Sequence, residues 1–307
     1  MPARNEEDVI ERCVRSCLDQ TAKPYEIIVV NDGSTDRTRE IVEGLMQKNK
    51  VVKLLNFESG HSAAFARNRG AEAAKGDIVY FLDADIIVED RNFISKLEKT
   101  FQNEKVGAML SGTPGDYKTF LQKCQGVRTM MSNLFFRASG MRINYVTGIR
   151  RKLFEEVGGF NEKIFYYEDR ELGNRIASRM EIPMVIMKLR HVEPSTLSEI
   201  ARQARYVGKG VSTYGIIKEN PLVLVYPPYP FFWIVFIACV LLSFVNIIFL
   251  YILALLFLIL IIEFIIASYI SRMILPSLCF VFFISPLRAF LITYSFLRNK
   301  LKALIPG

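Results

Sequence analysis

Residues 231–270 form a nearly uncharged apolar run, which constrains the fold more than any other part of the chain. The run is roughly 40 residues long, about twice what one helical bilayer crossing needs, and Glu263 is its only charged residue. A helix of a soluble protein has a polar face, which this run lacks. The sequence therefore predicts two transmembrane helices, Pro230 to about Phe249 and Tyr251 to about Ile270, in preference to a buried hairpin of a soluble protein.

Basic residues after the run indicate its orientation. The turn between the two predicted helices, 243–246, has no charge, whereas five basic residues follow the second helix: Arg272, Arg288, Arg298, Lys300 and Lys302. Because basic flanking segments stay in the cytoplasm, both termini are expected there. Pro286 and Arg288 interrupt the stretch 276–302, so it is expected to be an interfacial or re-entrant segment with a basic tail rather than a third crossing.

Charge, cysteine content and glycine motifs exclude several classes of protein. The formal net charge is +8, but the soluble part mixes acids and bases without a basic-aromatic patch. Anionic lipid or a phosphorylated substrate is therefore favoured over nucleic acid. Five cysteines lack the spacing of a disulfide framework or a metal site, which is typical of structural thiols in a reducing compartment. No Gly-x-Gly-x-x-Gly or Gly-x4-Gly-Lys-[Ser/Thr] turn follows a strand, which disfavours a dinucleotide oxidoreductase and a P-loop NTPase.

Predicted strands and helices alternate through the first third of the chain. Short β-branched runs alternate with amphipathic stretches, in the order 26–34, 34–49, 51–57, 62–74 and 77–85. This alternation predicts an α/β fold with a parallel sheet covered by helices on both faces. Such sheets bind ligands beyond the carboxyl ends of their strands. Both "NDGS" (31–34) and "DAD" (83–85) lie at such ends, so the two segments predict a site.

Asp83 and Asp85 interrupt an apolar strand, where an unpaired charge is costly. Alternate residues of a strand point the same way, so the two carboxylates are expected to share a face. Two hard oxygen ligands at a strand end suit Mg²⁺ or Mn²⁺, with other positions left for substrate phosphates. The plainer alternative is a strand-end turn with solvated acids.

Three further groups of residues are candidates, each with a plainer alternative. Glu168 and Asp169 open a predicted helix, either as a general base for a hydroxyl or simply as carboxylates at the positive end of the helix dipole. Arg202, Arg205 and Tyr206 share one side of a helix and suit a diphosphate or an acceptor, or else lipid headgroups. His191 is either a metal or phosphate ligand or a structural histidine.

Six motifs occur in one order along the chain: "PARNEED" (2–8), "IIVVNDGSTD" (27–36), "ARNRGAEAAKGDIVYFLDAD" (66–85), "GGFNE" (158–162), "EDREL" (168–172) and "RQARY" (202–206). This order resembles that of family-2 glycosyltransferases, inverting enzymes of the GT-A fold that often carry C-terminal membrane helices. The resemblance spans about residues 2–210. It implies a nucleoside-diphosphate sugar as donor and a divalent cation, Mg²⁺ or Mn²⁺, as cofactor.

On the donor side, the resemblance assigns roles to single residues. The loop with Ala3, Arg4 and Glu6 resembles the segment that embraces the donor's nucleoside. Asp32 matches the carboxylate that hydrogen-bonds the base. Gly60 and Arg67 match residues that lie along the nucleotide. Asp83 and Asp85 match the Asp-x-Asp pair that binds the metal, and the first of the two usually also lies near the ribose.

On the acceptor side, Asp169 matches the catalytic base, with Glu168 beside it. Arg202, Arg205 and Tyr206 resemble the Gln-x-x-Arg-Trp motif of processive synthases, but Arg replaces Gln and Tyr replaces Trp. This departure argues against processive synthesis and leaves a diphosphate-binding role for Arg205. The family also has an apolar strand before the "PARNEE" loop, and this chain starts at that loop.

Taken together, the sequence and the resemblance predict a GT-A catalytic domain with a Rossmann-like mixed sheet (1–210, its first strand apparently missing), a membrane-proximal connector (211–229), a transmembrane hairpin (230–271) and an interfacial or re-entrant segment with a basic tail (272–307). The expected protein is a multi-pass membrane enzyme with a cytoplasmic catalytic domain. It is expected to move a sugar to a lipid-linked or polyprenyl-phosphate acceptor at the cytoplasmic leaflet, because a soluble enzyme would need no apolar hairpin. The alternatives are a polysaccharide synthase subunit and a catalytically impaired protein that binds nucleotide sugars.

Overall fold

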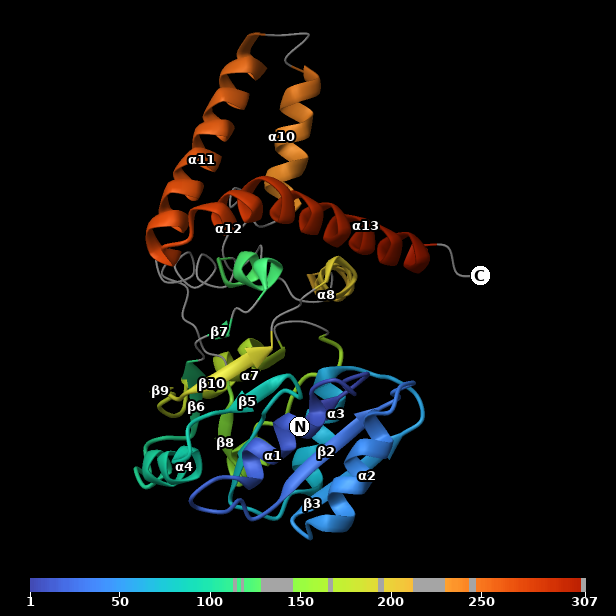
Figure 1. Ribbon diagram of the computed structural model, residues 1–307, viewed down its shortest axis with the longest axis vertical. Coiled ribbons are helices and arrows are strands. Elements are labelled where there is room, and N and C mark those ends of the chain that lie inside the picture. The colour runs from blue at the N-terminus through green and yellow to red at the C-terminus, as the bar shows by residue number, and fades with distance from the viewer. Residues whose placement is uncertain are drawn as a thin grey trace. The chain divides into compact units, whose positions relative to one another are not determined.

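The structure is a computed structural model that describes residues 1–112, 115–116, 119–127, 146–164, 168–192, 196–211, 230–242 and 247–304 (Figure 1). The chain divides into two compact units. The first contains Met1–Asp116 and Asn144–Val192, and the second contains Tyr117–Ile143 and Glu193–Gly307. The first unit is α/β, whereas the described elements of the second are helical. The domain borders expected from the sequence remain a prediction.

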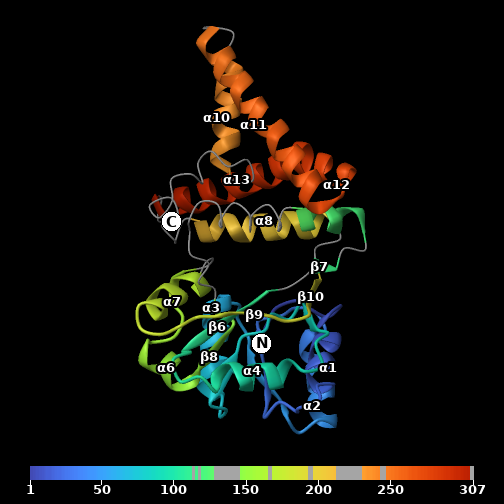
Figure 2. The same ribbon diagram turned by 90° about the vertical axis from the view of Figure 1, so that its left-hand side faces the viewer.

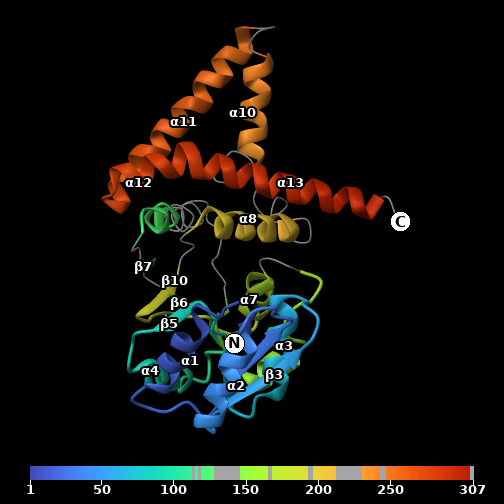
Figure 3. The ribbon, with the colours of Figure 1, turned by 45° about the vertical axis from the view of Figure 1, so that its right-hand side comes forward.

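A parallel sheet opens the first unit, with the strand order β1-β2-β3. Its strands are β1 (Pro2–Ala3), β2 (Ile27–Asp32) and β3 (Val52–Phe57), and three helices pack around it: α1 (Ile10–Leu18), α2 (Thr38–Lys48) and α3 (Ala63–Ala73) (Figures 1 and 3). Val29 packs in a cluster with α1 and α2, whereas Val30, one residue on, faces Gly70 of α3. The sheet is thus covered on both faces, as the alternation of strands and helices predicts.

Mixed pairing completes the first unit. One sheet has the order β4-β8-β6-β9 and another has the order β5-β10-β7. Their strands are β4 (Ile78–Tyr80), β5 (Ile86–Val88), β6 (Ala108–Gly112), β7 (Gly115–Asp116), β8 (Gly148–Arg150), β9 (Met184–Ile186) and β10 (Leu189–Val192), and their helices are α4 (Phe93–Phe101), α6 (Arg151–Glu156) and α7 (Glu168–Ala177) (Figure 2). Because β4 runs antiparallel to β8, and β5 to β10, the fold is a mixed α/β fold rather than a purely parallel one.

Two local predictions are wrong. The strand expected over 77–85 ends at Tyr80, and Asp83 and Asp85 lie in the link between β4 and β5, where Ile86 N–H donates to the Asp83 carbonyl at 3.1 Å. The carboxylates therefore do not share a strand face; leaving the ladder frees their backbone to turn. Residues 2–3, expected in a loop, form β1, because Pro2 and Ala3 pair with Val30 and Asn31 of β2.

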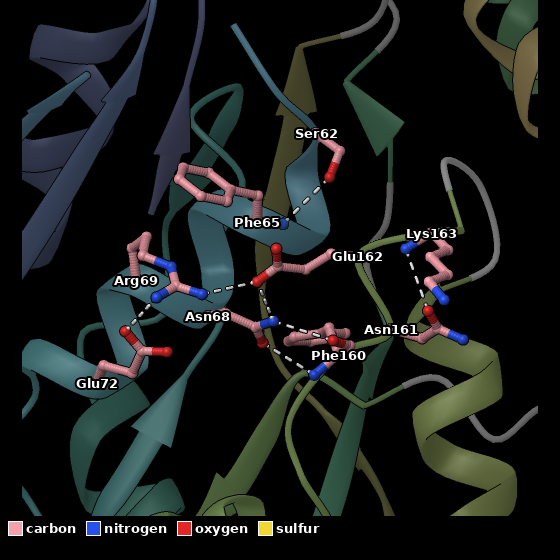
Figure 4. A network of polar contacts seen from close by, with 9 residues as sticks. All are labelled: Ser62, Phe65, Asn68, Arg69, Glu72, Phe160, Asn161, Glu162 and Lys163. Atoms are coloured by element: carbon pink, nitrogen blue, oxygen red, sulfur yellow. Dashed lines mark hydrogen bonds and ion pairs between the residues drawn. The ribbon is translucent and has the colours of Figure 1, made fainter. Parts of the chain in front are cut away.

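A network around Asn68 ties α3 to the "GGFNE" segment that precedes α7 (Figure 4). The Asn68 amide donates to the Phe160 carbonyl and accepts from its N–H, both at 2.9 Å, and also donates to Glu162 at 2.8 Å. Gly159 has φ +66°, and a Cβ there would lie 2.8 Å from Asn68 Oδ1, so glycine is required. A buried amide thus replaces regular pairing and positions the chain that leads into α7.

The described part of the second unit is helical. Its helices are α8 (Leu197–Val211), α10 (Pro230–Leu242), α11 (Ile247–Ser271), α12 (Ile274–Cys279), the π-helix η2 (Phe280–Ile284) and α13 (Ser285–Leu304), and residues 120–127 are helical as well. Figure 2 shows α8 and α13 side by side. Arg288 donates to Gln203 and Ser295 to the Arg205 carbonyl, both at 2.8 Å. The basic residue that was expected to break an apolar segment is thus buried against α8.

Two described segments are long and apolar enough to cross a membrane, by length and composition alone: Tyr251–Tyr269 and Ile274–Ile292. The first agrees with the second helix expected from sequence. The described part of α10 has 13 residues, short of the roughly 17–25 that a crossing needs. The segment expected to be interrupted at Pro286 continues as a helix instead. Proline has no N–H to donate to the preceding turn. The π-helix η2 immediately before α13 changes the hydrogen-bond register there, and this accommodates the missing donor.

Candidate active site

Asp32 ends β2 and is held by the loop that follows β3. The Asp32 side chain is 7% exposed, and its carboxylate accepts from the His61 backbone N–H at 2.9 and 3.0 Å and from the His61 ring Nδ1 at 2.9 Å. Gly33 has φ +68°, and a Cβ there would lie 2.5 Å from Gly60 N. The turn after β2 and the loop after β3 therefore touch through backbone, which only glycine permits.

The loop after β1 lies beside the same turn. Asn5, in the left-handed region with φ +58°, accepts from Thr35 N–H at 2.8 Å, and its own N–H donates to Ser34 at 3.0 Å. The Arg4 guanidinium is close enough to Gly60 that any side chain there would displace it. The structure thus brings together four predicted donor-binding residues: Ala3 in β1, Arg4, Asp32 and Gly60. Glu6, also predicted, lies one residue after Asn5 and donates its N–H to Thr38 at 2.8 Å.

Arg67 of α3 joins two carboxylates that come from different elements. It donates to Asp83 at 2.8 Å and to Glu168, the first residue of α7, and its guanidinium lies 5.6 Å from the Phe160 ring centre. Burial raises the pKa of Asp83, but the charge and the hydrogen bond of Arg67, together with the charges of His191 and the N-terminus, hold that pKa below its ordinary value. Burial lowers the pKa of Arg67. The negative charges of the surrounding carboxylates, of which Asp83 has the largest effect, raise it and keep it above its ordinary value.

Asp169 follows Glu168 at the start of α7. Burial raises the pKa of Asp169 to about 7, and the neighbouring charge of Glu168 adds to this rise. The Arg67 charge and a hydrogen bond from Arg170 N–H at 2.7 Å act in the opposite direction. The side chain is only partly buried, so a carboxyl group that titrates near neutrality remains open to a substrate.

Asp85 and His191 form a second pair beside Asp83. The His191 Nε2 lies 3.2 Å from Asp85 Oδ2, and Val192 N–H donates to the Asp85 carbonyl at 2.8 Å. Antiparallel pairing of β10 with β5 brings them together, since His191 pairs with Ile86. Asp83 and Asp85 therefore lie in one turn, but each carboxylate faces a different basic side chain.

The donor atoms of this turn suit a hard cation. Among the described residues, no three His, Cys, Asp or Glu side chains form a group that could hold a metal ion. Mg²⁺ is usually bound by only one or two carboxylates together with water and substrate phosphates. Asp83 and Asp85 supply that number, so the chemistry of the residues fits such an ion.

The remaining predicted residues lie in the second unit. Arg202 and Arg205 are exposed on α8, and Tyr206 follows in the same helix. Their role as acceptor or diphosphate ligands stays a prediction. His61 was missed by sequence reasoning, although it directly follows Gly60 in a motif that was assigned to the donor.

Comparisons with known proteins agree with this architecture. The family model described as "Glycosyl transferase family 2" matches residues 1–158 of the 307 in the chain. An uncharacterized glycosyltransferase of Haemophilus influenzae is 37% identical over 34% of this chain and 42% of its own length. The glycosyltransferase EpsJ of Bacillus subtilis is 31% identical over 65% of this chain and 62% of its own length. The chain thus spans less than two thirds of either relative.

Two further matches bear on the fold and on the range of the family. A poly-beta-1,6-N-acetyl-D-glucosamine synthase of Staphylococcus epidermidis is 34% identical over 36% of this chain and 26% of its own length. The structure of the mannosyltransferase PcManGT from Pyrobaculum calidifontis, in complex with GDP-Man and Mn²⁺, aligns with a TM-score of 0.60 at 16% identity, over 97% of this chain and 86% of that one. This likeness shows a GT-A fold. With the family model matching the first 158 residues, the chain belongs to glycosyl transferase family 2.

Proposed function

We propose that this chain is an inverting glycosyltransferase that moves a sugar from a nucleoside-diphosphate sugar to a lipid-linked or polyprenyl-phosphate acceptor. One observation carries the proposal: Arg67 holds Asp83, in the turn at the end of β4, and Glu168, next to Asp169, in one network. A donor-side carboxylate and a candidate base are thereby part of one rigid arrangement within the first unit.

The donor side is formed by the ends of β1, β2 and β3. Asp32 and the loops with Arg4 and Gly60 form the nucleoside end, as the family resemblance implies. The mannosyltransferase with the similar fold is in complex with GDP-Man and Mn²⁺, which supports a nucleoside-diphosphate sugar as donor here. Asp83 and Asp85 would hold a divalent cation, which when bound neutralises the phosphates of the leaving diphosphate; His191 orients Asp85.

Asp169 acts on the acceptor side. With a hydroxyl acceptor, its carboxylate takes the hydroxyl proton while that oxygen bonds to the anomeric carbon; with an already ionised acceptor phosphate, it steers the attacking phosphate oxygen instead. In both cases the bond from the anomeric carbon to the diphosphate oxygen breaks. A single displacement inverts the anomeric centre. A pKa near 7 suits this role, because a general base works best when its pKa lies near the working pH.

The second unit bears on the acceptor. Segments Tyr251–Tyr269 and Ile274–Ile292 are apolar and long enough to cross a bilayer, so an acceptor in the cytoplasmic leaflet is the economical choice. The multi-pass arrangement with a cytoplasmic catalytic domain belongs to this proposal. In it, Arg202, Arg205 and Tyr206 bind the phosphates of the acceptor or of the leaving group.

A polysaccharide synthase is the second candidate, because one relative is a poly-beta-1,6-N-acetyl-D-glucosamine synthase. The two candidates differ in product length. A single transfer gives one lipid-extractable product of fixed size, whereas a synthase gives a ladder of sizes on a gel.

The test uses membranes that contain the full chain, Mn²⁺ and a panel of radiolabelled nucleotide sugars. Transfer to extractable lipid is expected for one donor, and Asp169→Asn should reduce it by a factor of roughly 10² to 10⁴, the usual contribution of a general base, while donor affinity stays nearly unchanged. Full turnover by Asp169→Asn would remove this residue from the mechanism. Absence of label in every lipid and polymer fraction would contradict the proposed function.

A further inference from the structure

His61 covers the carboxylate that the family resemblance assigns to the nucleobase. Asp32 is 5% exposed, and both of its oxygens accept hydrogen bonds from His61, through the backbone N–H and the ring Nδ1. The imidazole side chain itself is 39% exposed. The group that Asp32 presents to a ligand is therefore the imidazole ring in front of it.

The pairing determines which ring nitrogen can accept a hydrogen bond. Asp32 Oδ1 lies 2.9 Å from Nδ1, and an ionised carboxylate only accepts, so Nδ1 carries the hydrogen. In the neutral imidazole the lone pair is then on Nε2. The contact of Nε2 with the Ser59 hydroxyl is 3.5 Å long, at the outer limit of a hydrogen bond. A better donor can replace it.

Aromatic neighbours fix the orientation of the ring. The Phe65 ring stacks on it with centroids 4.0 Å apart and planes 18° from parallel, and Phe57 meets it edge-on at 6.2 Å. The loop that carries His61 also touches the turn at Gly33 through backbone. An imidazole held by a carboxylate, a stacked ring and an edge ring loses little further freedom when a ligand binds.

We propose that His61, positioned by Asp32, recognises the nucleobase of the donor, and that the base carries a ring N–H, as uracil and guanine do. A ring N–H donates to the lone pair on Nε2, whereas adenine and cytosine present a ring nitrogen lone pair at the equivalent position and would be repelled. Asp32 is then a positioning residue that sets the tautomer. The inference rests on the proposed function, since it assumes a nucleoside-diphosphate sugar as donor.

Methylated nucleotides test this hydrogen bond without changing the protein. Binding of UDP, GDP, ADP and CDP to the full chain in detergent micelles with Mn²⁺ is measured by calorimetry. UDP or GDP should bind most tightly. Its analogue methylated on the ring nitrogen, 3-methyl-UDP or 1-methyl-GDP, should bind about ten-fold more weakly, the effect of roughly one lost hydrogen bond.

Two isosteric substitutions separate the two ring nitrogens. The amide of His61→Asn reaches Asp32 in place of Nδ1 but leaves no group at Nε2, whereas His61→Gln can place its amide oxygen near Nε2. His61→Asn should bind the nucleotide about ten-fold more weakly and lose the discrimination against the methylated analogue. His61→Gln should retain part of both. Circular dichroism confirms that each variant is folded.

The outcomes distinguish this inference from the proposed function. If the wild-type chain binds a nucleotide and His61→Asn still rejects the methylated analogue as strongly, another group, Asp32 itself foremost, reads the ring N–H and the inference fails alone. Tightest binding of ADP or CDP overturns it as well. If the wild-type chain binds none of the four nucleotides, the proposed function fails together with it.

Discussion

Glu168 and Glu263 are both buried glutamates, one in each unit, and their surroundings differ. Glu168 is 7% exposed and Glu263 is 4% exposed. Glu168 accepts from Arg67, which also holds Asp83. Among the residues that the structure describes, neither carboxyl oxygen of Glu263 has a hydrogen-bond partner. Its neighbours one turn away on α11, Leu260 and Ala267, belong to an apolar cluster.

The difference shows how each unit obtains its stability. In the first unit, opposite charges compensate one another, and this compensation places the carboxylates of Asp83 and Glu168, the neighbour of Asp169, around the buried Arg67. In the second unit, apolar contacts between helices dominate, and the carboxyl group of Glu263 takes part in no described polar pair. A buried ion pair thus holds the geometry of the first unit, whereas in the second unit the buried Arg288 is held by a neutral partner, Gln203, and Glu263 has no described polar partner.

The largest expected effect comes from removing the shared cation. Arg67→Met leaves Glu168, whose side chain is 9% exposed, buried without its partner and also removes the partner of the more exposed Asp83, so the free energy of unfolding should fall by about 3–5 kcal/mol. Arg69→Met is the matched control on the same helix. Arg69 is 35% exposed and pairs with Glu72 and Glu162, so its loss should cost about 1 kcal/mol or less. Urea unfolding followed by circular dichroism measures the free energy of unfolding of both variants. Equal losses in the two variants would contradict the view that the first unit depends on the charge of Arg67.

A second prediction concerns the pH dependence of transfer. Because the base must be deprotonated, the rate should rise with pH and level off above about 7, the raised pKa of Asp169. Glu168→Gln removes a neighbouring negative charge that raises this pKa, so the acidic limb should move to lower pH by about one unit, a typical effect of one nearby charge. Glu263→Gln is the control and should leave the limb in place. If the acidic limb of the pH–rate profile lies at the same pH in Glu168→Gln as in the wild type, the charge of Glu168 does not influence the pKa of the catalytic base.

The carboxyl group of Asp169 also makes stability depend on pH: the rate of transfer should rise with pH, whereas the free energy of unfolding should fall. The native pKa of Asp169 is raised from 3.8 to about 7, so between these values the native state holds a proton that the unfolded state has lost. This group therefore lowers the free energy of unfolding as pH rises from about 4 to about 7. Asp169→Asn removes the effect, so the wild-type chain should lose stability relative to this variant across that range. Parallel stability curves of the two proteins against pH would contradict the prediction.

Much of the first unit could be predicted because its signals are local. The alternation of β-branched runs and amphipathic stretches identified β2, α2 and β3, and the motif order identified Asp83 and Asp169. The contacts that create the site are not local. Arg67 and Glu168 are 101 residues apart, and His61 is 29 residues from Asp32, so no periodicity links them.

Predictions failed where backbone turns or packing override pattern. The strand signal runs through Asp83, but β4 ends at Tyr80. The bond from Phe81 N–H to the Thr147 carbonyl, at 2.7 Å, extends the pairing with β8 by one residue, and the chain then turns, with Ile86 N–H donating to the Asp83 carbonyl at 3.1 Å. In the second unit, Arg288 and Pro286 indicated a break. The structure instead buries Arg288, 6% exposed, against Gln203, a partner that lies 85 residues away and that hydropathy does not reveal.

The smallest expected effect is that of Glu263→Gln, and it tests the contrast between the two glutamates most directly. Glu263→Gln keeps the shape of the side chain and removes its ability to ionise, so the free energy of unfolding in detergent should change by less than about 0.5 kcal/mol or rise, because an unpaired buried carboxyl contributes no attraction. Glu168→Gln, the matched substitution in the first unit, weakens a charge-assisted bond to Arg67 and should cost roughly 1.5–3 kcal/mol. Both variants are unfolded under the same conditions. A loss above about 1 kcal/mol in Glu263→Gln would show that this carboxyl group is engaged in the folded chain, and the contrast between the two glutamates would then fail.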